Sequence, residues 1–325
     1  MNEDEGMKKT LYPSDVSLHP GAAASPAVAS AEAKVKAESA GGGTWRMVLA
    51  MLLSGTIGLL VVESGLPVQL VVWLRCLLGG LGLASYLAWS GLWLRPARSE
   101  WLWVLVGGAA LVINWLCLFS AYHYSSIAVS TVVYHVQPFL LLLLAALFQG
   151  ERLALRRLPW LVLALLGVVL SSGLTVNAGA QSQSQAQWLG VGLALLAALL
   201  YAVATLATQR LKRIAPAQIA LLQMIVGVLV LAWPAWQALG QAQFSIKAWG
   251  AVLTLGLVHT AWMYTLMYAA FQRLPAQSIA GLSFIYPVVA LWVDVLWFGT
   301  RPQLAQWLGM ALILAAVWAY RRSHS

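Results

Sequence analysis

Two stretches of the chain decide the fold: SAYHYSSIAVSTVVYHVQPFLLLLLAALFQGER at 120–152 and AAFQRLPAQSIAGLSFIYPVVALWVDVLWFGTR at 269–301. Each is largely apolar, carries a proline inside it and has a glycine close to its end. Pro138 of the first stretch matches Pro287 of the second at an offset of 149 residues, and the glycines match at the same offset. A helix that crosses a bilayer needs about 20 predominantly apolar residues. The two stretches therefore predict equivalent membrane helices in a chain that repeats itself.

Further runs of similar length and polarity lie on both sides of these two stretches. Strand-length alternation of polar and apolar residues is absent, which argues against a membrane β-barrel. Short polar breaks separate the runs, so each is expected to be one helix. The ten runs cover about 46–63, 68–93, 101–122, 126–149, 158–176, 187–208, 217–238, 248–271, 276–298 and 304–320.

The composition excludes an ordinary soluble enzyme. Of 325 residues, 61% are hydrophobic and 9% are charged, whereas a typical soluble domain carries about 25% charged residues. A soluble fold of this size would have to expose too much apolar surface. We therefore expect an all-α integral membrane protein with ten transmembrane helices.

The repeat divides the chain into three parts. Residues 1–44 are rich in Ala, Ser, Glu and Lys and are expected to form a disordered cytoplasmic tail, with no run of signal-peptide length. Residues 45–176 form the first unit of five helices, and residues 187–322 form the second. Because five is odd, the second unit enters the membrane upside down relative to the first. Inverted repeats of this kind are common in secondary transporters, which bind substrate near the midplane between the halves.

The basic residues set the orientation rather than a partner. The net charge of +9 would suggest nucleic acid in a soluble protein. With the N-terminus in the cytoplasm, however, sixteen of the nineteen Lys and Arg residues fall in cytoplasmic segments. Only Lys247 and Arg301 fall in the outer loops, and Arg75 lies within a helix. This bias predicts a multi-pass protein of the bacterial inner membrane with both ends in the cytoplasm. The expected contacts are membrane lipid and a small substrate, and no nucleic acid.

Ten helices in two inverted halves resemble the EamA branch of the drug/metabolite transporter superfamily. The resemblance rests on Pro138 with the Leu-rich sequence and Gly150-Glu151-Arg152 that follow it, and on Pro287 with Gly299-Thr300-Arg301. Arg75 after Val-Val-Trp-Leu also resembles the family's second-helix pattern. The second half has Thr where the family's pattern has Glu, so we assign Thr300 no role. The resemblance implies export of small metabolites, amino acids or drugs, often coupled to protons.

Ionisable side chains inside a membrane are costly and therefore candidates for function. Asp294 lies in the ninth run on one helical face with Ser283 and Pro287. A carboxylate in apolar surroundings binds a proton more readily, which suits proton coupling; hydration near the surface or pairing with Arg75 is the alternative. Arg75 itself is expected to hold a substrate carboxylate or to pair with Asp294 or Glu63.

Other polar and aromatic residues near the middle of the runs complete the candidate substrate-binding or coupling set. The two histidines are expected to relay protons or donate to an anionic group, or else to bond a backbone carbonyl. The amide and phenol offer neutral hydrogen bonds to a substrate or to a neighbouring helix, and the tryptophan lines a cavity or packs. The paired prolines are expected to kink their helices and act as hinges. The residues are His135, His259, Asn114, Tyr201, Trp262 and Ser283, with Pro138 and Pro287 as the hinges.

These features together predict a secondary active transporter that works by alternating access. We expect export of small metabolites, such as amino acids or aromatic or drug-like compounds, driven by protons. No Gly-rich ATP-binding motif and no catalytic or metal-ligand cluster occurs in the sequence, so no cofactor or metal is expected and the chain is not expected to be an enzyme. A passive facilitator and a membrane-embedded transferase remain the alternatives.

Overall fold

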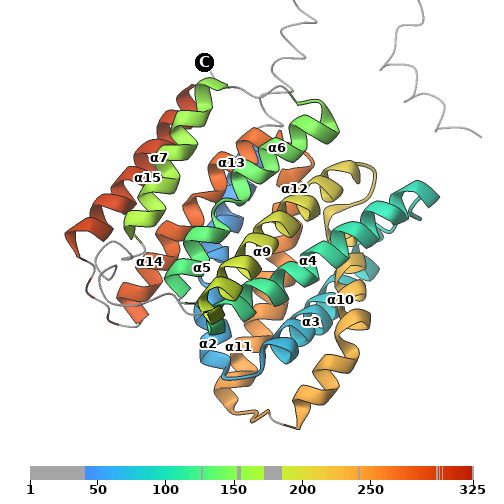
Figure 1. Ribbon diagram of the computed structural model, residues 1–325. Helices are drawn as coiled ribbons and strands as arrows, with labels where there is room; N and C mark the ends of the chain where they lie inside the picture. The colour runs from blue at the N-terminus through green and yellow to red at the C-terminus, as the bar shows by residue number, and fades with distance from the viewer. Residues whose placement is uncertain are drawn as a thin grey trace, which may run out of the picture. The chain divides into compact units, whose positions relative to one another are not determined.

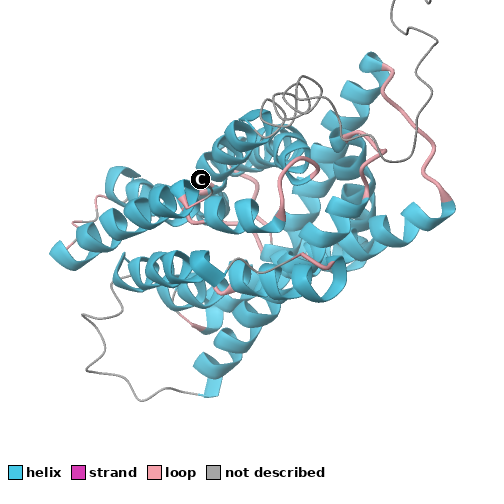
Figure 2. Ribbon diagram, turned by 90° about the horizontal axis from the view of Figure 1, so that it is seen from above, coloured by secondary structure: helices cyan, strands magenta, loops and turns pink. Residues whose placement is uncertain are grey.

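The computed structural model describes residues 41–125, 127–151, 155–171, 185–240, 242–297, 299, 301 and 303–323. Within these ranges the chain is helical and contains no strand, as Figures 1 and 2 show. The all-α prediction is therefore confirmed. The predicted tail at 1–44 lies outside the described residues except for its last four.

The first half of the chain supplies five of the expected runs. A helix over 41–54 continues through a turn into α2 and makes the first run. The fourth run is divided into α5 and α6, and a short 3₁₀ turn, η1, precedes the fifth. The elements are α2 (Ile57–Ser64), α3 (Val68–Ser90), α4 (Arg98–Tyr124), α5 (Ile127–Tyr134), α6 (Gln137–Gln149), η1 (Leu155–Arg157) and α7 (Leu158–Ser171).

The second half follows the same plan and also contains two interrupted runs. The eighth run contains a π-helical turn, η2, between α11 and α12, and the ninth run is divided into α13 and α14. The elements are α9 (Gln185–Arg210), α10 (Pro216–Leu239), α11 (Ile246–Gly256), η2 (Leu257–Trp262), α12 (Met263–Phe271), α13 (Ala276–Ser283), α14 (Ile285–Trp297) and α15 (Leu304–Arg322).

Eight of the described helical segments are long and apolar enough to cross a membrane. A ninth apolar helix, Leu304–Tyr320, is shorter, and α7 has 14 described residues. These two helices pack on one another (Figure 1), with Gly167 of α7 meeting the backbone of Gly309 on α15. The structure thus contains helices at all ten predicted runs, and eight of them meet the length of a span.

The matched prolines coincide with matched helix breaks. Helix α5 ends at Tyr134 and α6 begins at Gln137, so that Pro138 lies in the first turn of the new helix. Likewise α13 ends at Ser283, two residues before α14 begins, and Pro287 lies in its first turn. Proline is tolerated there because the N–H it lacks would have no partner in the helix. The two breaks fall at equivalent places in the two halves.

The ends of the same two runs are also alike. Gly150 follows α6 with a φ of 68°, and Gly299 follows the ninth run with a φ of 65°. Both values lie in the left-handed region, where a residue without Cβ pays little penalty. The amide of Gly150 bonds the carbonyl of Ala145 and so closes the helix. The glycines noted in the sequence are therefore helix terminators.

The most extensive contacts join the two halves. Helix α4 packs along α9, α3 along α10, α7 along α15, α6 on α13 and α2 on α11. Figure 1 shows α4 beside α9 and α3 beside α10. The main hydrophobic core of the described residues contains side chains of both halves.

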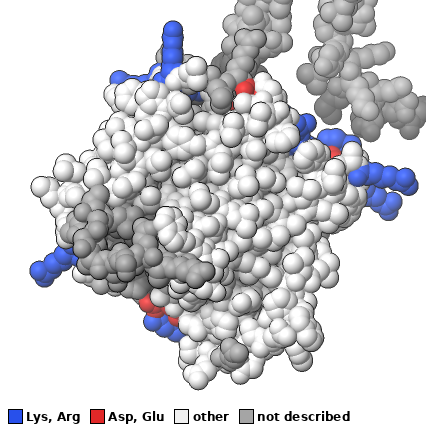
Figure 3. Space-filling model, viewed as in Figure 1, with Lys and Arg blue, Asp and Glu red and all other residues white. Residues whose placement is uncertain are grey.

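The outer surface of the described residues is apolar. Leu229 is 72% exposed and Leu147 is 68% exposed, which would be unfavourable in water. In the view of Figure 3 the centre of the face is uncharged, and Lys and Arg appear at its periphery. Such a surface suits a lipid environment.

Candidate functional site

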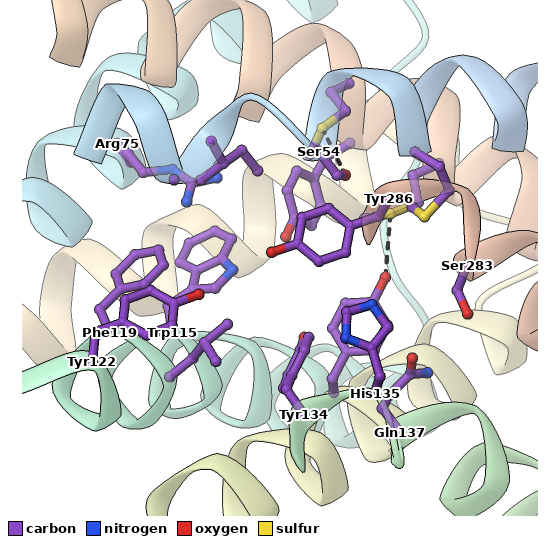
Figure 4. Close-up of a pocket in the computed structure, with 18 residues that line it drawn as sticks. Ser54, Arg75, Trp115, Phe119, Tyr122, Tyr134, His135, Gln137, Ser283 and Tyr286 are labelled. Atoms are coloured by element: carbon purple, nitrogen blue, oxygen red, sulfur yellow. Dashed lines mark hydrogen bonds between the residues drawn. The ribbon is translucent and has the colours of Figure 1, made fainter. Parts of the chain in front are cut away.

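A cavity lies among helices from both halves of the chain. Eighteen described residues line it, and most of them are aromatic or apolar with a few polar groups among them, as is typical of small-molecule sites. The lining comes from the first, second, third and fourth runs and from the sixth, eighth and ninth. Figure 4 shows Arg75 and Trp115 together on one side of the cavity and His135 and Gln137 on another.

Arg75 forms the basic corner of the cavity. Its side chain comes from the middle of α3 and is fully buried. Its Nε donates to Thr260 Oγ1 at 3.3 Å, its Nη2 approaches the His259 carbonyl at 3.5 Å, and its Cζ lies 4.2 Å from the ring centre of Trp115. Its Nη1 has no hydrogen-bond partner among the described residues.

The π-helical turn η2 presents the groups that hold Arg75. Thr260 Oγ1 donates to the Leu255 carbonyl at 2.7 Å, five residues earlier, and so fixes its lone pairs toward Arg75. His259 is buried and lies within hydrogen-bond distance of Thr56 Oγ1 and of the Thr254 carbonyl, at 2.7 Å and 3.2 Å. His259 does not line the cavity. It supports Arg75 from behind, through its carbonyl.

His135 lines the cavity at the break between α5 and α6. Its Nδ1 lies 2.6 Å from the Thr131 carbonyl, which can only accept, so Nδ1 carries a proton. The ring stacks on Tyr286 with centroids 5.3 Å apart and planes 8° from parallel. The matched breaks of the two halves therefore meet at this stacked pair, one ring from each.

The remaining wall is aromatic and sulfur-rich. Tyr134 packs edge-on against Tyr201, and Tyr201 donates to Met267 Sδ at 3.5 Å. Trp115 packs edge-on against Tyr264 with centroids 5.6 Å apart. Polarisable rings and thioethers of this kind accommodate a flat apolar body. Among the described lining residues none carries a carboxylate.

The residues singled out from the sequence fall into two groups. Arg75, His135, Tyr201 and Ser283 line the cavity. Asn114 lies behind it: its Nδ2 donates to the Ala197 carbonyl at 2.7 Å and joins α4 to α9. The alternative pairing of Arg75 with Glu63 is absent, because Glu63 forms an ion pair with Lys247 and accepts from Trp297 Nε1.

Three further predictions are placed as follows. Trp262 is 51% exposed on the outer surface of η2 and is not part of the cavity wall. Pro138 and Pro287 are buried at the helix breaks next to the lining residues. The backbone of Asp294 belongs to α14, whereas its side chain lies outside the described residues.

Sequence reasoning missed several lining residues. Tyr134, Gln137 and Tyr286 each lie within four residues of a matched proline, so the breaks themselves were the available signal. Trp115 lies deep in its run, which left cavity lining and packing open as alternatives, and Tyr264 gave no signal, since an aromatic residue inside an apolar run is more often packed than exposed to a cavity. Among the described residues there is no group of three or more His, Cys, Asp or Glu side chains that could hold a metal ion.

Comparison with known proteins assigns the family. The model of the EamA-like transporter family matches twice, over residues 42–173 and 188–321. The chain belongs to the EamA-like transporter family. It is therefore a multi-pass membrane protein, and family membership places it with transporters rather than enzymes.

Relatives of this EamA-like chain carry transporter names. The uncharacterized transporter YxxF of Bacillus subtilis is 32% identical over 274 residues, covering 84% of this chain and 87% of YxxF. The pseudopaline exporter CntI of Pseudomonas aeruginosa is 28% identical over 274 residues, covering 83% of this chain and 93% of CntI. A crystal structure overlays with a TM-score of 0.72 at 22% identity, covering 85% of this chain and 96% of that one, and it shows a shared fold.

Proposed function

We propose that this protein is a secondary active transporter that exports a small organic molecule by alternating access, driven by protons. The observation that carries the proposal is the central cavity, which is walled by both halves and lined by aromatic and apolar side chains with a few polar groups. An exporter among the relatives supports the direction. The substrate class suited to this wall is a small molecule with an apolar or aromatic body, such as an amino-acid-related or drug-like compound.

The proposed architecture is ten spans in two inverted repeats, 45–176 and 187–322. The helix pairing supports this architecture. Helix α4 of the third run contacts α9 of the sixth run. If the two halves are exchanged, this contact becomes one between the eighth run and the first, and such a contact is observed between α11 and α2. The pairs α3–α10, α6–α13 and α7–α15 map onto themselves under the same exchange. A two-fold axis in the membrane plane requires that each helix contact have an equivalent of this kind.

A layer of amide side chains beyond the cavity supports alternating access. Gln149 Nε2 donates to Gln209 Oε1 at 3.2 Å, Gln209 Nε2 donates to the Leu274 carbonyl at 3.1 Å, and Gln272 Nε2 donates to the Leu211 carbonyl at 2.7 Å. On α9 and α6 this layer lies two turns or more beyond the lining residues. These bonds join helix ends of both halves, and we propose that they close the cytoplasmic end in this state.

The proposed location is the bacterial inner membrane, with both ends of the chain in the cytoplasm. Arg210 bonds the Phe148 carbonyl and Arg157 bonds Gln277 at the end that carries the amide layer. The Lys247–Glu63 pair belongs to the opposite end. The excess of basic residues on the first end supports its assignment to the cytoplasm.

Asp294 is the proposed proton-coupling residue. It lies on α14 eight residues from Tyr286, which lines the cavity, and eight residues of helix span about 12 Å. A single carboxylate near the path between cavity and outer surface suits a group that binds and releases a proton once per cycle.

Reconstitution in liposomes tests the proposal. Saturable counterflow of aromatic and aliphatic metabolites, accelerated by an imposed pH gradient, is expected. Asp294→Asn is expected to abolish the acceleration and to spare exchange, with Glu63→Gln as the matched control because its carboxylate pairs with Lys247. Saturable flux that ignores the gradient would leave a passive facilitator, and absence of saturable flux would refute transport.

A further inference from the structure

Arg75 brings an unneutralised positive charge into the cavity wall. It is fully buried, and its Nη1 has no hydrogen-bond partner among the described residues. The described part of the chain contains one ion pair, Lys247 with Glu63, and it does not involve Arg75. A guanidinium stays charged in proteins, and a buried charge without a counter-ion is costly to keep.

The contacts that Arg75 does make position it without neutralising it. Its bonds to Thr260 and to the His259 carbonyl are long, at 3.3 Å and 3.5 Å, and both acceptors are neutral. The face of Trp115 covers the guanidinium plane from one side, with Cζ 4.2 Å from the ring centre. The stacking and the two hydrogen bonds fix the plane of the guanidinium, and Nη1 remains available to donate to a ligand.

We propose that Arg75 is the anchor for the carboxylate of an anionic, amphipathic substrate whose apolar body lies against the aromatic and thioether wall. This inference rests on the proposed function, because the cavity must be the transport site for the anchor to select cargo. The bound carboxylate supplies the counter-charge that the wall lacks. In this arrangement Trp115 stacks on the guanidinium that binds the carboxylate, and the edge of its ring contacts the apolar body of the ligand.

The charge of the wall favours a monocarboxylate over other cargo. No described lining residue carries a carboxylate, so an organic cation, or the ammonium of a zwitterion, finds no counter-ion among them and is repelled by Arg75. Phosphate and polyanions are usually held by several basic groups, whereas this wall has one guanidinium. The other titratable nitrogen-bearing side chain, His135, already uses its Nδ1 on the Thr131 carbonyl.

Matched probes on the wild-type protein test the proposal without any mutation. Phenylacetate, phenylacetamide and phenethylammonium share one apolar body and differ in charge, as do indole-3-acetate, indole-3-acetamide and tryptamine. Binding to the full chain in detergent is measured at neutral pH by thermal shift and by calorimetry. The carboxylates are expected to bind about 10- to 100-fold more tightly than their amides, as one charge-assisted contact implies. Carboxylates that bind no better than amides or amines would overturn the proposal.

Variants assign the effect to Arg75. Arg75→Gln is expected to bring the carboxylate-to-amide affinity ratio close to one while amide binding persists, which shows that the cavity is still folded. Arg75→Lys keeps the charge but loses the planar fork and is expected to restore only part of the ratio. Arg95→Gln, at an exposed position between α3 and α4, is the matched control and should keep the ratio of the wild type.

Two results would contradict the anchor. A ratio that survives in Arg75→Gln would place the carboxylate elsewhere. A carboxylate preference that appears only in Asp294→Asn would give Arg75 an internal partner instead of a ligand. Flux measured in liposomes is a separate readout: loss of carboxylate preference with intact transport removes the anchor alone, whereas binding without any transport refutes the proposed function.

Discussion

Replacing Gly79 by alanine tests whether the close approach of α3 and η2 holds the site together. A Cβ built on Gly79 would lie 2.5 Å from Thr260 Cγ2, 2.7 Å from Thr260 Cβ and 2.9 Å from the Gly256 carbonyl oxygen. Ordinary van der Waals contact begins at 3.4 Å, so the two segments must separate by about 0.9 Å at this point. Thr260 cannot rotate away freely, because it is β-branched and its hydroxyl bonds the Leu255 carbonyl.

The expected cost follows from that overlap. Overpacking of this kind costs typically about 1–3 kcal/mol, and the higher helix propensity of alanine returns up to about 1 kcal/mol. A net loss of about 0–3 kcal/mol lowers the apparent melting midpoint by up to roughly 12 °C at about 2–4 °C per kcal/mol. The matched control is Gly80→Ala, whose new Cβ meets Met224 Cβ at 3.6 Å and should leave the midpoint unchanged or slightly higher.

The assay is thermal unfolding of the purified full chain in detergent, followed by ligand binding. Gly79→Ala should also weaken carboxylate binding, because displacing Thr260 removes the acceptor of Arg75 Nε. Adding Thr260→Ser removes Cγ2, the nearest atom, keeps the hydroxyl, and should recover part of both losses. Equal midpoints for Gly79→Ala and Gly80→Ala would refute the reasoning, since only the first creates an overlap.

Three other variants probe a buried hydrogen bond, the hinges and the surface. Tyr268→Phe removes the donor to buried Gln223 and should lower stability by about 1 kcal/mol, visible as a lower midpoint; an unchanged midpoint would mean that the amide finds another donor. Pro138→Ala with Pro287→Ala should slow counterflow several-fold with probe affinity retained, because each restored N–H favours a continuous helix; faster exchange would contradict a hinge role. Lys247→Gln should change stability by less than about 1 kcal/mol, since the lysine is 65% exposed; a larger fall would show that the pair is buried in the membrane-bound protein.

The positions of the helices and of their breaks could be predicted because those signals are local. Apolar length predicts where a helix crosses a bilayer, and a proline within such a run predicts where it is interrupted. Pro138 and Pro287 marked both breaks to within a few residues. The same breaks carry His135 and Tyr286 to their stacked contact. That contact joins the two halves across 151 residues of sequence and could only be expected in outline, from the repeat.

The π-helical turn shows why the rest of the site could not be predicted. The run over 248–271 is largely apolar, and nothing in it indicates that residues 257–262 have an i→i+5 turn instead of an i→i+4 turn. Within this turn Thr260 lies with its Oγ1 3.3 Å from Arg75 Nε.

Arg75 could be singled out from the sequence, but the groups that surround its guanidinium could not be predicted. Charged residues are scarce in this chain, so a basic residue inside an apolar run is conspicuous. Because a charge inside a membrane is costly, two interpretations followed: an internal ion pair or a ligand site. Choosing between them requires knowing which groups reach the guanidinium. Those groups come from α4, 40 residues away, and from η2, 185 residues away. They are an aromatic face and a hydroxyl, so the groups that the structure describes orient the charge and do not neutralise it. A transporter that must release its cargo gains from this arrangement, because a ligand that supplies the missing counter-charge can also leave once the helices around Arg75 move.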